Sequence, residues 1–217
     1  MSFGLVGNIC FGVSVTFVLA QGGLQVLDAA QKKGMDGFCI CVQPTADAVC
    51  VVAHDRDFGG MAALRKTRFN DLPKQKDGKP FPRLSDALDV GAAIVNIELV
   101  GEPGWKNALA AVEGHDSIPR VIFSSLEHSE ILQLWAACPK AKCGFIWEQH
   151  EADAIEEGEL SDLPDTLLLF VPAVSISARP GFWTKYAKRL VVWGLARRED
   201  TSPLGLGPAG CIVTDRC

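Results

Sequence analysis

Short apolar, β-rich runs alternate with helix-length segments along this chain, and this alternation restricts the fold more than any other feature of the sequence. A helix is predicted to begin near Ser85, and apolar residues recur at helical spacing in five other segments. Strands separated by helices build parallel sheets, and eight of them are typical of a (β/α)8 TIM barrel. The prediction is therefore an α/β barrel of one domain over 1–217. The predicted strands are 5–11, 38–43, 92–99, 120–124, 142–147, 167–171, 190–195 and 211–214, and the five other helices are 24–33, 105–113, 129–137, 152–157 and 181–188.

An open doubly wound sheet is the competing architecture for the same alternation. No glycine-rich phosphate motif follows the first predicted strand, which disfavours a nucleotide-binding version of that sheet.

The longest stretch without a regular pattern is 56–80, which is rich in Arg, Lys, Asp and Gly and contains the turn signals Gly59-Gly60 and Asp77-Gly78. We interpret it as a short insertion after the second strand.

Residues 1–21 carry no charge, which allows three interpretations. A signal peptide has a cationic start, and Met-Ser-Phe-Gly has none. A membrane span is diluted here by glycines and by Asn8, Ser14 and Thr16. A buried parallel strand over 5–11 fits best, because buried strands form continuous apolar runs and the barrel needs a first strand. No integral membrane span is expected.

Composition limits the partners. The net charge of −5 provides no cationic surface for a phosphate backbone, so nucleic acid is not expected as a partner. The chain has 8 cysteines but neither a CxxC pair nor a regular framework, which favours reduced, mostly buried thiols and a cytoplasmic location. The oligomeric state leaves no signal in the sequence.

The stretch 35–55 brings reactive side chains together. Its alternating run and turn residues predict a β-hairpin, on which Cys39 and Cys41 share one face near the end of a strand. His54 and Asp55 follow the second arm of the hairpin. Two thiols and one imidazole are therefore expected near one edge of the sheet.

In order and spacing, several stretches of the chain resemble the glycerophosphodiester phosphodiesterase family, whose fold is a TIM barrel. The hairpin GFCICVQPTADAVCVVAHD is similar to the family's second strand and its His-Asp loop. FPRLSDALDV, VNIEL and RVIFSSLEHSEILQL are similar to the next helix and strands, and VVWGLARRED and GPAGCIVTDRC are similar to the last two strands. The resemblance implies a hydrolase of lipid metabolism that acts on small phosphodiesters such as deacylated phospholipid head groups.

The resemblance also implies which positions form the site. His54 matches a catalytic histidine, with Asp55 beside it, and Glu98 matches a metal ligand. The other two metal carboxylates of the family fall on Cys39 and Cys41.

Three further positions of the family motif are altered or ambiguous. Its first-strand His-Arg-Gly falls nearest to Cys10-Phe11-Gly12, and its phosphate-binding Lys falls on Val100. The tryptophan of the seventh strand falls on Trp193, which is either a surface for substrate stacking or core, with core favoured.

These replacements predict altered or absent chemistry. The family implies Mg²⁺ or Ca²⁺, but hard cations need several oxygen ligands, and Glu98 alone does not provide them. Hydrolysis also needs one group that protonates the leaving group and another that activates the nucleophile. With His54 as the single matching histidine, imidazole cannot do both.

Three interpretations of Cys10, Cys39 and Cys41 stay open. They are small buried hydrophobes, a soft site for Zn²⁺ with His54 or Glu98, or a disulfide between Cys10 and one of the strand cysteines. Two functions follow from the residues: a phosphodiesterase with an altered site, or a pseudoenzyme whose barrel mouth binds a small molecule, a thiophilic metal or a protein partner.

Overall fold

The computed structural model describes residues 16–19, 32, 37–53, 64–75, 78–101, 104–194 and 211–213, with backbone only at 16–19 and 211–213. The predicted helix 24–33 lies outside these residues except for Lys32, which is helical. Three predicted site residues, Cys10, His54 and Asp55, also lie outside them.

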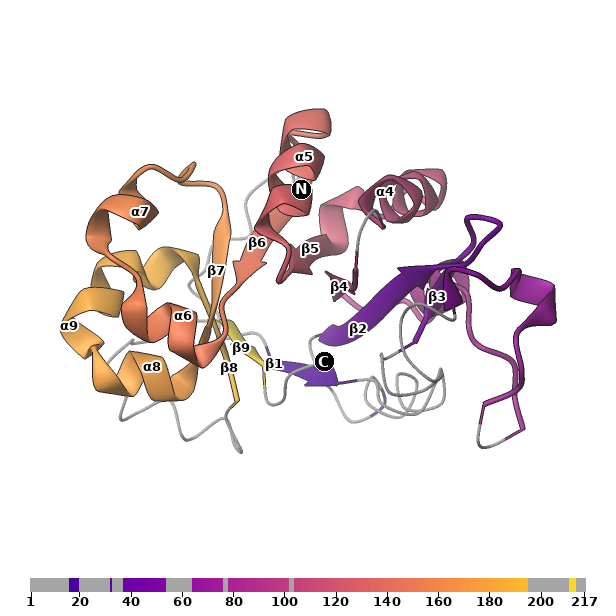
Figure 1. Cartoon of the computed structure of the whole chain (residues 1–217), viewed down its shortest axis with the longest axis horizontal. Coiled ribbons are helices and arrows are strands. Elements are labelled where there is room, and N and C mark those ends of the chain that lie inside the picture. Colours follow the sequence, from indigo (N-terminus) through magenta and orange to yellow (C-terminus); the bar gives the residue numbers. More distant parts are fainter. Residues whose placement is uncertain are drawn as a thin grey trace, which may run out of the picture.

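Eight parallel strands form a closed ring, which confirms the predicted TIM barrel (Figure 1). Each strand pairs with the next one around the ring, and β1 pairs in parallel with both β2 and β9. The strands are β1 (Thr16–Leu19), β2 (Gly37–Pro44), β4 (Ile94–Leu99), β5 (Val121–Ser125), β6 (Lys142–Ile146), β7 (Leu168–Pro172), β8 (Leu190–Trp193) and β9 (Cys211–Val213). The strands run in the same direction, so their carboxyl ends meet at one end of the barrel, which we call the mouth.

A ninth strand, β3 (Cys50–Val52), lies antiparallel to the end of β2 and completes the predicted hairpin. The turn between them is held by the Thr45 hydroxyl, which donates to Asp47 Oδ1 over 2.7 Å. Ala48 closes the turn with a φ of 64°. The hairpin therefore extends β2 beyond the ring, on the mouth side.

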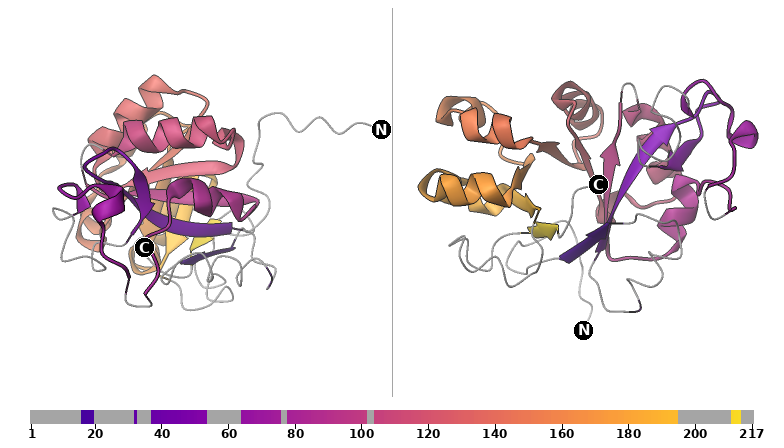
Figure 2. Two further views of the ribbon diagram at one scale, coloured as in Figure 1. Left: turned by 90° about the vertical axis from the view of Figure 1, so that its right-hand side faces the viewer. Right: turned by 60° about the horizontal axis from the view of Figure 1, so that its bottom comes forward.

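Helices surround the strands in an outer layer (Figure 2). In α4 the apolar residues Trp105, Ala108, Leu109 and Val112 recur at helical spacing and pack in one cluster with the outer face of β2. The α-helices are α3 (Leu84–Asp89), α4 (Trp105–Gly114), α5 (His128–Ala137), α6 (Gln149–Ala154), α7 (Glu157–Ser161), α8 (Ala173–Ala178) and α9 (Pro180–Trp183), and the 3₁₀ segments are η2 (Phe69–Asp71), η3 (Ile118–Arg120) and η4 (Thr184–Arg189).

The predicted insertion is an excursion that packs against the β2–β3 hairpin, and its described residues are 64–75 and 78–80. In Figure 1 it lies beside β3, on the opposite side of the molecule from α6 to α9. Leu64 is buried in a small cluster with Val51, Ala53 and Phe81. Two hydrogen bonds hold it to the hairpin turn, from Ala46 N to Thr67 O over 3.0 Å and from Phe69 N to Asp47 Oδ1 over 2.9 Å.

The predicted position of the first strand is wrong. The first strand of the ring is Thr16–Leu19, whereas 5–11 lies outside the described residues. The physical reason lies in composition: Thr16-Phe17-Val18 is β-branched and aromatic, while the earlier run is interrupted by Gly4, Gly7 and Gly12. Cys10 lies outside the described residues, so its match to the family's first-strand motif stays a prediction.

Two helical segments also differ from their predictions. The single helix predicted over 152–157 is the pair α6 and α7, and the helix predicted over 181–188 is α9 followed by η4, with α8 before it. Within the described part of the chain, no helix is sufficiently long and apolar to cross a membrane.

Candidate functional site

The alternation of side chains along each strand separates the barrel interior from the outer layer. On β2, Phe38, Ile40 and Val42 pack in the cluster that contains the residues of α4, so they face outward. Cys39 and Cys41 form a separate cluster with Val100 and face the interior. The predicted common face of the two cysteines is therefore confirmed, and that face lines the barrel.

The interior is polar on one side and apolar on the other. The polar side is formed by β2, β4 and β5 and bears Cys39, Cys41, Gln43, Asn96, Glu98 and Ser124. The apolar side is formed mainly by β6, β7 and β8, and its buried cluster is Ile122, Ile146, Leu168, Phe170 and Val191. The buried polar groups of the described interior therefore lie on the β2–β4–β5 side.

A glycine shapes the apolar side. A Cβ added to Gly144 would lie 2.5 Å from Phe170 Cε2 and 2.9 Å from Leu168 Cβ. The Phe170 ring therefore lies directly over the backbone of β6 and takes the place of a side chain there. Gly144 is the register partner of Ser124, so this ring lies next to the polar side.

Glu98 stands in the middle of the polar side with 6% of its surface exposed. Its neighbour across the sheet is Cys41, and Cys39 is paired in the same way with Asn96. Asn96 Nδ2 donates to Cys39 Sγ over 3.1 Å. Strand pairing thus brings the predicted metal-ligand positions Cys39, Cys41 and Glu98 together.

The two cysteines differ in chemical state. Cys41 forms no disulfide, whereas Cys39 is disulfide-bonded. Cys50, Cys138 and Cys143 are the other free thiols among the described residues, so the prediction of reduced thiols fails at Cys39. Burial raises the pKa of Cys50 and of Cys143 to about 12, which keeps both in the unreactive thiol form.

Three buried polar atoms on this side have no hydrogen-bond partner within the described part of the chain: Gln43 Oε1, Asn96 Oδ1 and Ser124 Oγ. Gln43 Nε2 donates to Ala53 O over 3.2 Å, so that amide is half satisfied. An unsatisfied buried polar group costs about 1–3 kcal/mol and is found mainly where a protein has a functional reason for it. A polar group of a ligand inside the barrel would satisfy these atoms.

The side chains present do not fit the metal that the resemblance implies. Mg²⁺ and Ca²⁺ take six or more oxygen ligands, and Glu98 is the single carboxylate on the described polar side. A disulfide sulfur is no thiolate, so Cys39 in this bond offers nothing to Zn²⁺ either. No group of three or more His, Cys, Asp or Glu side chains that could hold an ion occurs among the described residues. A soft-metal site stays a prediction for the reduced chain.

Trp193 packs at the mouth end of β8. Its side chain is partly buried against the apolar interior cluster, next to Pro172 on β7. This contact agrees with the interpretation of Trp193 as core.

Two residues at the mouth were not predicted from the sequence. Arg65, from the excursion, donates from Nη2 to Val100 O over 3.1 Å at the end of β4. Glu130 is 1% exposed, and its Oε1 accepts a hydrogen bond of 2.8 Å from Gly104 N, directly before α4. Both contacts depend on tertiary structure. No local periodicity predicts that Arg65 reaches Val100 or that the Glu130 carboxylate is buried at the start of a helix.

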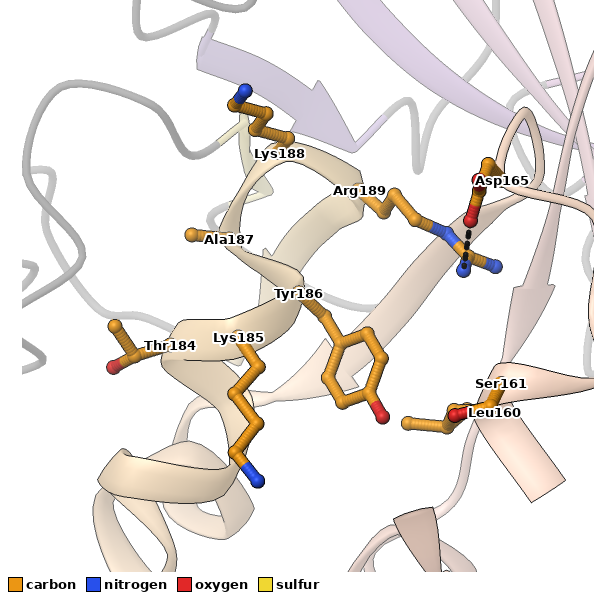
Figure 3. A pocket seen from close by; sticks show the side chains of 9 residues that line it. All are labelled: Leu160, Ser161, Asp165, Thr184, Lys185, Tyr186, Ala187, Lys188 and Arg189. Atoms are coloured by element: carbon orange, nitrogen blue, oxygen red, sulfur yellow. Dashed lines mark ion pairs between the residues drawn. The ribbon is translucent and has the colours of Figure 1, made fainter. Parts of the chain in front are cut away.

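A second hollow, of about 790 Å³, lies at the opposite end of the barrel, where β7 and β8 begin (Figure 3). Two of the three cations that line it are paired: Lys185 Nζ lies 2.8 Å from Glu157 Oε2, and Arg189 Nη1 lies 3.7 Å from Asp165 Oδ1. Active sites of this architecture lie at the carboxyl ends of the strands. We therefore take the mouth, and not this hollow, as the candidate site.

Comparisons with known proteins agree with the barrel. Neither a protein-family model nor a curated protein matches the sequence. Among solved structures, a phosphodiesterase from Oleispira antarctica in complex with the product sn-glycerol-3-phosphate is similar with a TM-score of 0.73 and 16% identity, over 93% of this chain and 93% of that one.

Two further solved structures are similar over most of their length. A glycerophosphodiester phosphodiesterase from Parabacteroides distasonis has a TM-score of 0.71 at 17% identity, over 93% of both chains. One from Agrobacterium tumefaciens has a TM-score of 0.70 at 17% identity, over 94% of this chain and 96% of that one. At these identities the similarity establishes the fold: this chain has the barrel of the glycerophosphodiester phosphodiesterases.

Proposed function

We propose that this chain is a divergent member of the glycerophosphodiester phosphodiesterase family, a pseudoenzyme whose barrel binds a small ligand at its mouth and does not hydrolyse phosphodiesters. The shared barrel and the six stretches of sequence similar to the family's motifs support the relationship. The ligand is a small molecule, as in the solved phosphodiesterase that holds sn-glycerol-3-phosphate. One domain over 1–217 carries this role.

The observation that supports the loss of hydrolysis is the pairing of β2 with β4. The positions of two metal carboxylates bear a disulfide sulfur at Cys39 and a thiol at Cys41, and Cys41 faces the remaining carboxylate, Glu98. A hard cation bound by one carboxylate does not compensate the charge that develops on a phosphodiester in the transition state. The apolar Val100 at the lysine position removes a second source of that compensation.

Hydrolysis assays test this proposal directly. Purified protein is incubated with glycerophosphodiesters and with bis(p-nitrophenyl) phosphate in the presence of Mg²⁺, Ca²⁺ or Mn²⁺. We expect no turnover above that of the His54→Ala variant, because the positions of two metal carboxylates and of the phosphate-binding lysine bear Cys39, Cys41 and Val100. Turnover that depends on both the metal and His54 would refute the pseudoenzyme and favour an altered phosphodiesterase.

A further inference from the structure

The hollow at the end of the barrel opposite the mouth is large enough for a small molecule. Its volume of about 790 Å³ lies in the range of about 300–1,000 Å³ that is usual for ligand pockets. One wall is η4, which leads into β8, and the other is the segment between α7 and β7 (Figure 3). The 9 residues that line it include none of the predicted site residues. The hollow is therefore a candidate for a separate binding site.

Arg189 is the most deeply buried cation of this hollow. Its side chain is 11% exposed, and Nε donates to Leu167 O over 2.8 Å, which holds the guanidinium in place. Nη1 lies 3.7 Å from Asp165 Oδ1, which is too far for a hydrogen bond, and Nη2 is buried without a hydrogen-bond partner in the described part of the chain. Burial lowers the pKa of Arg189, but arginine stays protonated in proteins. A buried positive charge thus lacks acceptors at its two terminal nitrogens.

The charges around Arg189 leave room for an anion. The lining has three cations and one carboxylate, Asp165, although the whole chain has a net charge of −5. The Asp165 side chain is fully exposed, and an exposed partner holds a cation only weakly. Lys188 forms no ion pair with the described residues. Lys185 and Lys188 extend to opposite sides of the hollow in Figure 3, so Arg189 is the central contact for an anion.

Tyr186 adds an apolar surface to the same hollow. Its ring is partly buried against the core cluster that contains Leu160 and Leu190. Figure 3 shows this ring between Lys185 and Arg189. Aromatic rings stack on other planar groups, so a ligand with a planar part beside its anionic group fits the hollow better than a bare anion.

The lining is suited to binding and not to a reaction. Ser161 Oγ donates to Glu157 O over 2.9 Å, and Thr184 Oγ1 donates to Pro180 O over 2.7 Å, so both hydroxyls are already engaged. The lining contains neither a histidine nor a cysteine that could act as a base or a nucleophile.

We infer that this hollow binds a small organic anion, whose phosphate or carboxylate group contacts Arg189 and whose planar part packs on Tyr186. The anion takes the place of Asp165 and accepts hydrogen bonds from the terminal nitrogens of the guanidinium, whose planar fork matches either group. The inference goes beyond the proposed function, because the hollow lies at the other end of the barrel and does not need a ligand at the mouth.

Tyr186 is the single tyrosine of the chain, which permits a measurement specific to the hollow. Protein that contains 3-fluorotyrosine gives one ¹⁹F NMR resonance, and it is titrated with phenyl phosphate, inorganic phosphate and phenol. These probes carry the anion with a ring, the anion alone and the ring alone. We expect phenyl phosphate to shift the resonance saturably, with a lower Kd than either other probe. Absence of a saturable shift would overturn the inference, and so would phosphate or phenol binding as tightly as phenyl phosphate.

Asp165→Asn tests the same site by a gain of affinity, at a position where the side chain is fully exposed. It should lower the Kd of phenyl phosphate about twofold to fivefold, because it removes the carboxylate that competes for Arg189. Asp162→Asn is the matched control, since Asp162 is exposed on the same segment and does not line the hollow. It should change the Kd less than Asp165→Asn does. An unchanged or higher Kd in Asp165→Asn would contradict the inference.

Arg189→Gln should raise the Kd of phenyl phosphate about tenfold to a hundredfold, the usual effect of losing a charge-assisted hydrogen bond. Circular dichroism first checks that this variant folds, because Arg189 also holds Leu167 O. If it does not fold, the titration of Asp165→Asn decides. A folded Arg189→Gln variant with the Kd of the wild-type chain would overturn the site. Hydrolysis of a phosphodiester would refute the proposed function alone, since the hollow takes no part in it.

Discussion

Gly144 offers the sharpest test of how the barrel interior is packed. In Gly144→Ala the new Cβ would lie 2.5 Å from Phe170 Cε2, about 0.9 Å inside the shortest ordinary contact of 3.4 Å. The Phe170 ring is 3% exposed and cannot turn into solvent, and Leu168 Cβ, at 2.9 Å, is fixed to the backbone of β7. Strands β6 and β7 must therefore separate slightly or the ring must leave its rotamer.

Overpacking of this kind costs about 1–3 kcal/mol of unfolding free energy. For a chain of 217 residues this corresponds to a fall in Tm of about 2–12 °C. Urea and thermal unfolding followed by circular dichroism measure both quantities. Gly158→Ala is the control, because nothing lies within 4 Å of its added Cβ, and it should be neutral or stabilising by up to about 1 kcal/mol.

A double-mutant cycle identifies the cause. If the ring is the obstacle, Gly144→Ala in a Phe170→Leu background should cost less than in the wild-type chain, with a coupling of about 0.5–3 kcal/mol. Strict additivity, or a Gly144→Ala variant as stable as the wild-type chain, would refute this account of the packing.

Three further predictions concern the cysteines and Glu130. After unfolding without reductant, alkylation and mass spectrometry should label Cys41, Cys50, Cys138 and Cys143 but label Cys39 only after reduction; labelled Cys39 in the unreduced sample would contradict the disulfide. The pKa of Cys50 and of Cys143 is raised from 9.0 to about 12 in the folded chain, so the unfolding free energy should fall as the pH rises above about 9. An unfolding free energy that stays constant up to pH 11 would argue against the burial of these thiols. Glu130→Ala should lower the unfolding free energy, measured in urea, by about 1–3 kcal/mol, since it leaves Gly104 N without its acceptor. Glu130→Gln keeps an acceptor oxygen and should lower it less. Equal losses in the two variants would show that this hydrogen bond is unimportant.

Most of the ring was predictable from local patterns. Strand 168–172 is buried on both faces, so it is a continuous apolar run whose identity does not depend on distant residues. The first strand was misplaced because two apolar runs follow each other near the start of the chain, and glycine content, not hydrophobicity, separates them. The hairpin and the shared face of Cys39 and Cys41 followed from the period of two along a strand.

The candidate site was predictable only where it lies on strands. Register places Glu98 beside Cys41, and the order of the motifs anticipates that proximity. The contact of Arg65 with Val100 and the inward turn of Glu130 were not predictable, because a polar residue in an irregular segment or at a helix start is usually solvated. The disulfide state of Cys39 likewise depends on which sulfur the folded chain brings near it.

The pairing of β1 with β9 has a consequence for the order of assembly. Thr16 is in register with Ile212, so the ring is sealed by the strands that are synthesised first and last. Until β9 emerges, β1 has an unpaired edge, and such edges invite pairing with other chains. A strand of only 4 residues is a short template for such mispairing. The seam of the barrel is thus also the place where the edges of β1 and β8 stay open until β9 is synthesised.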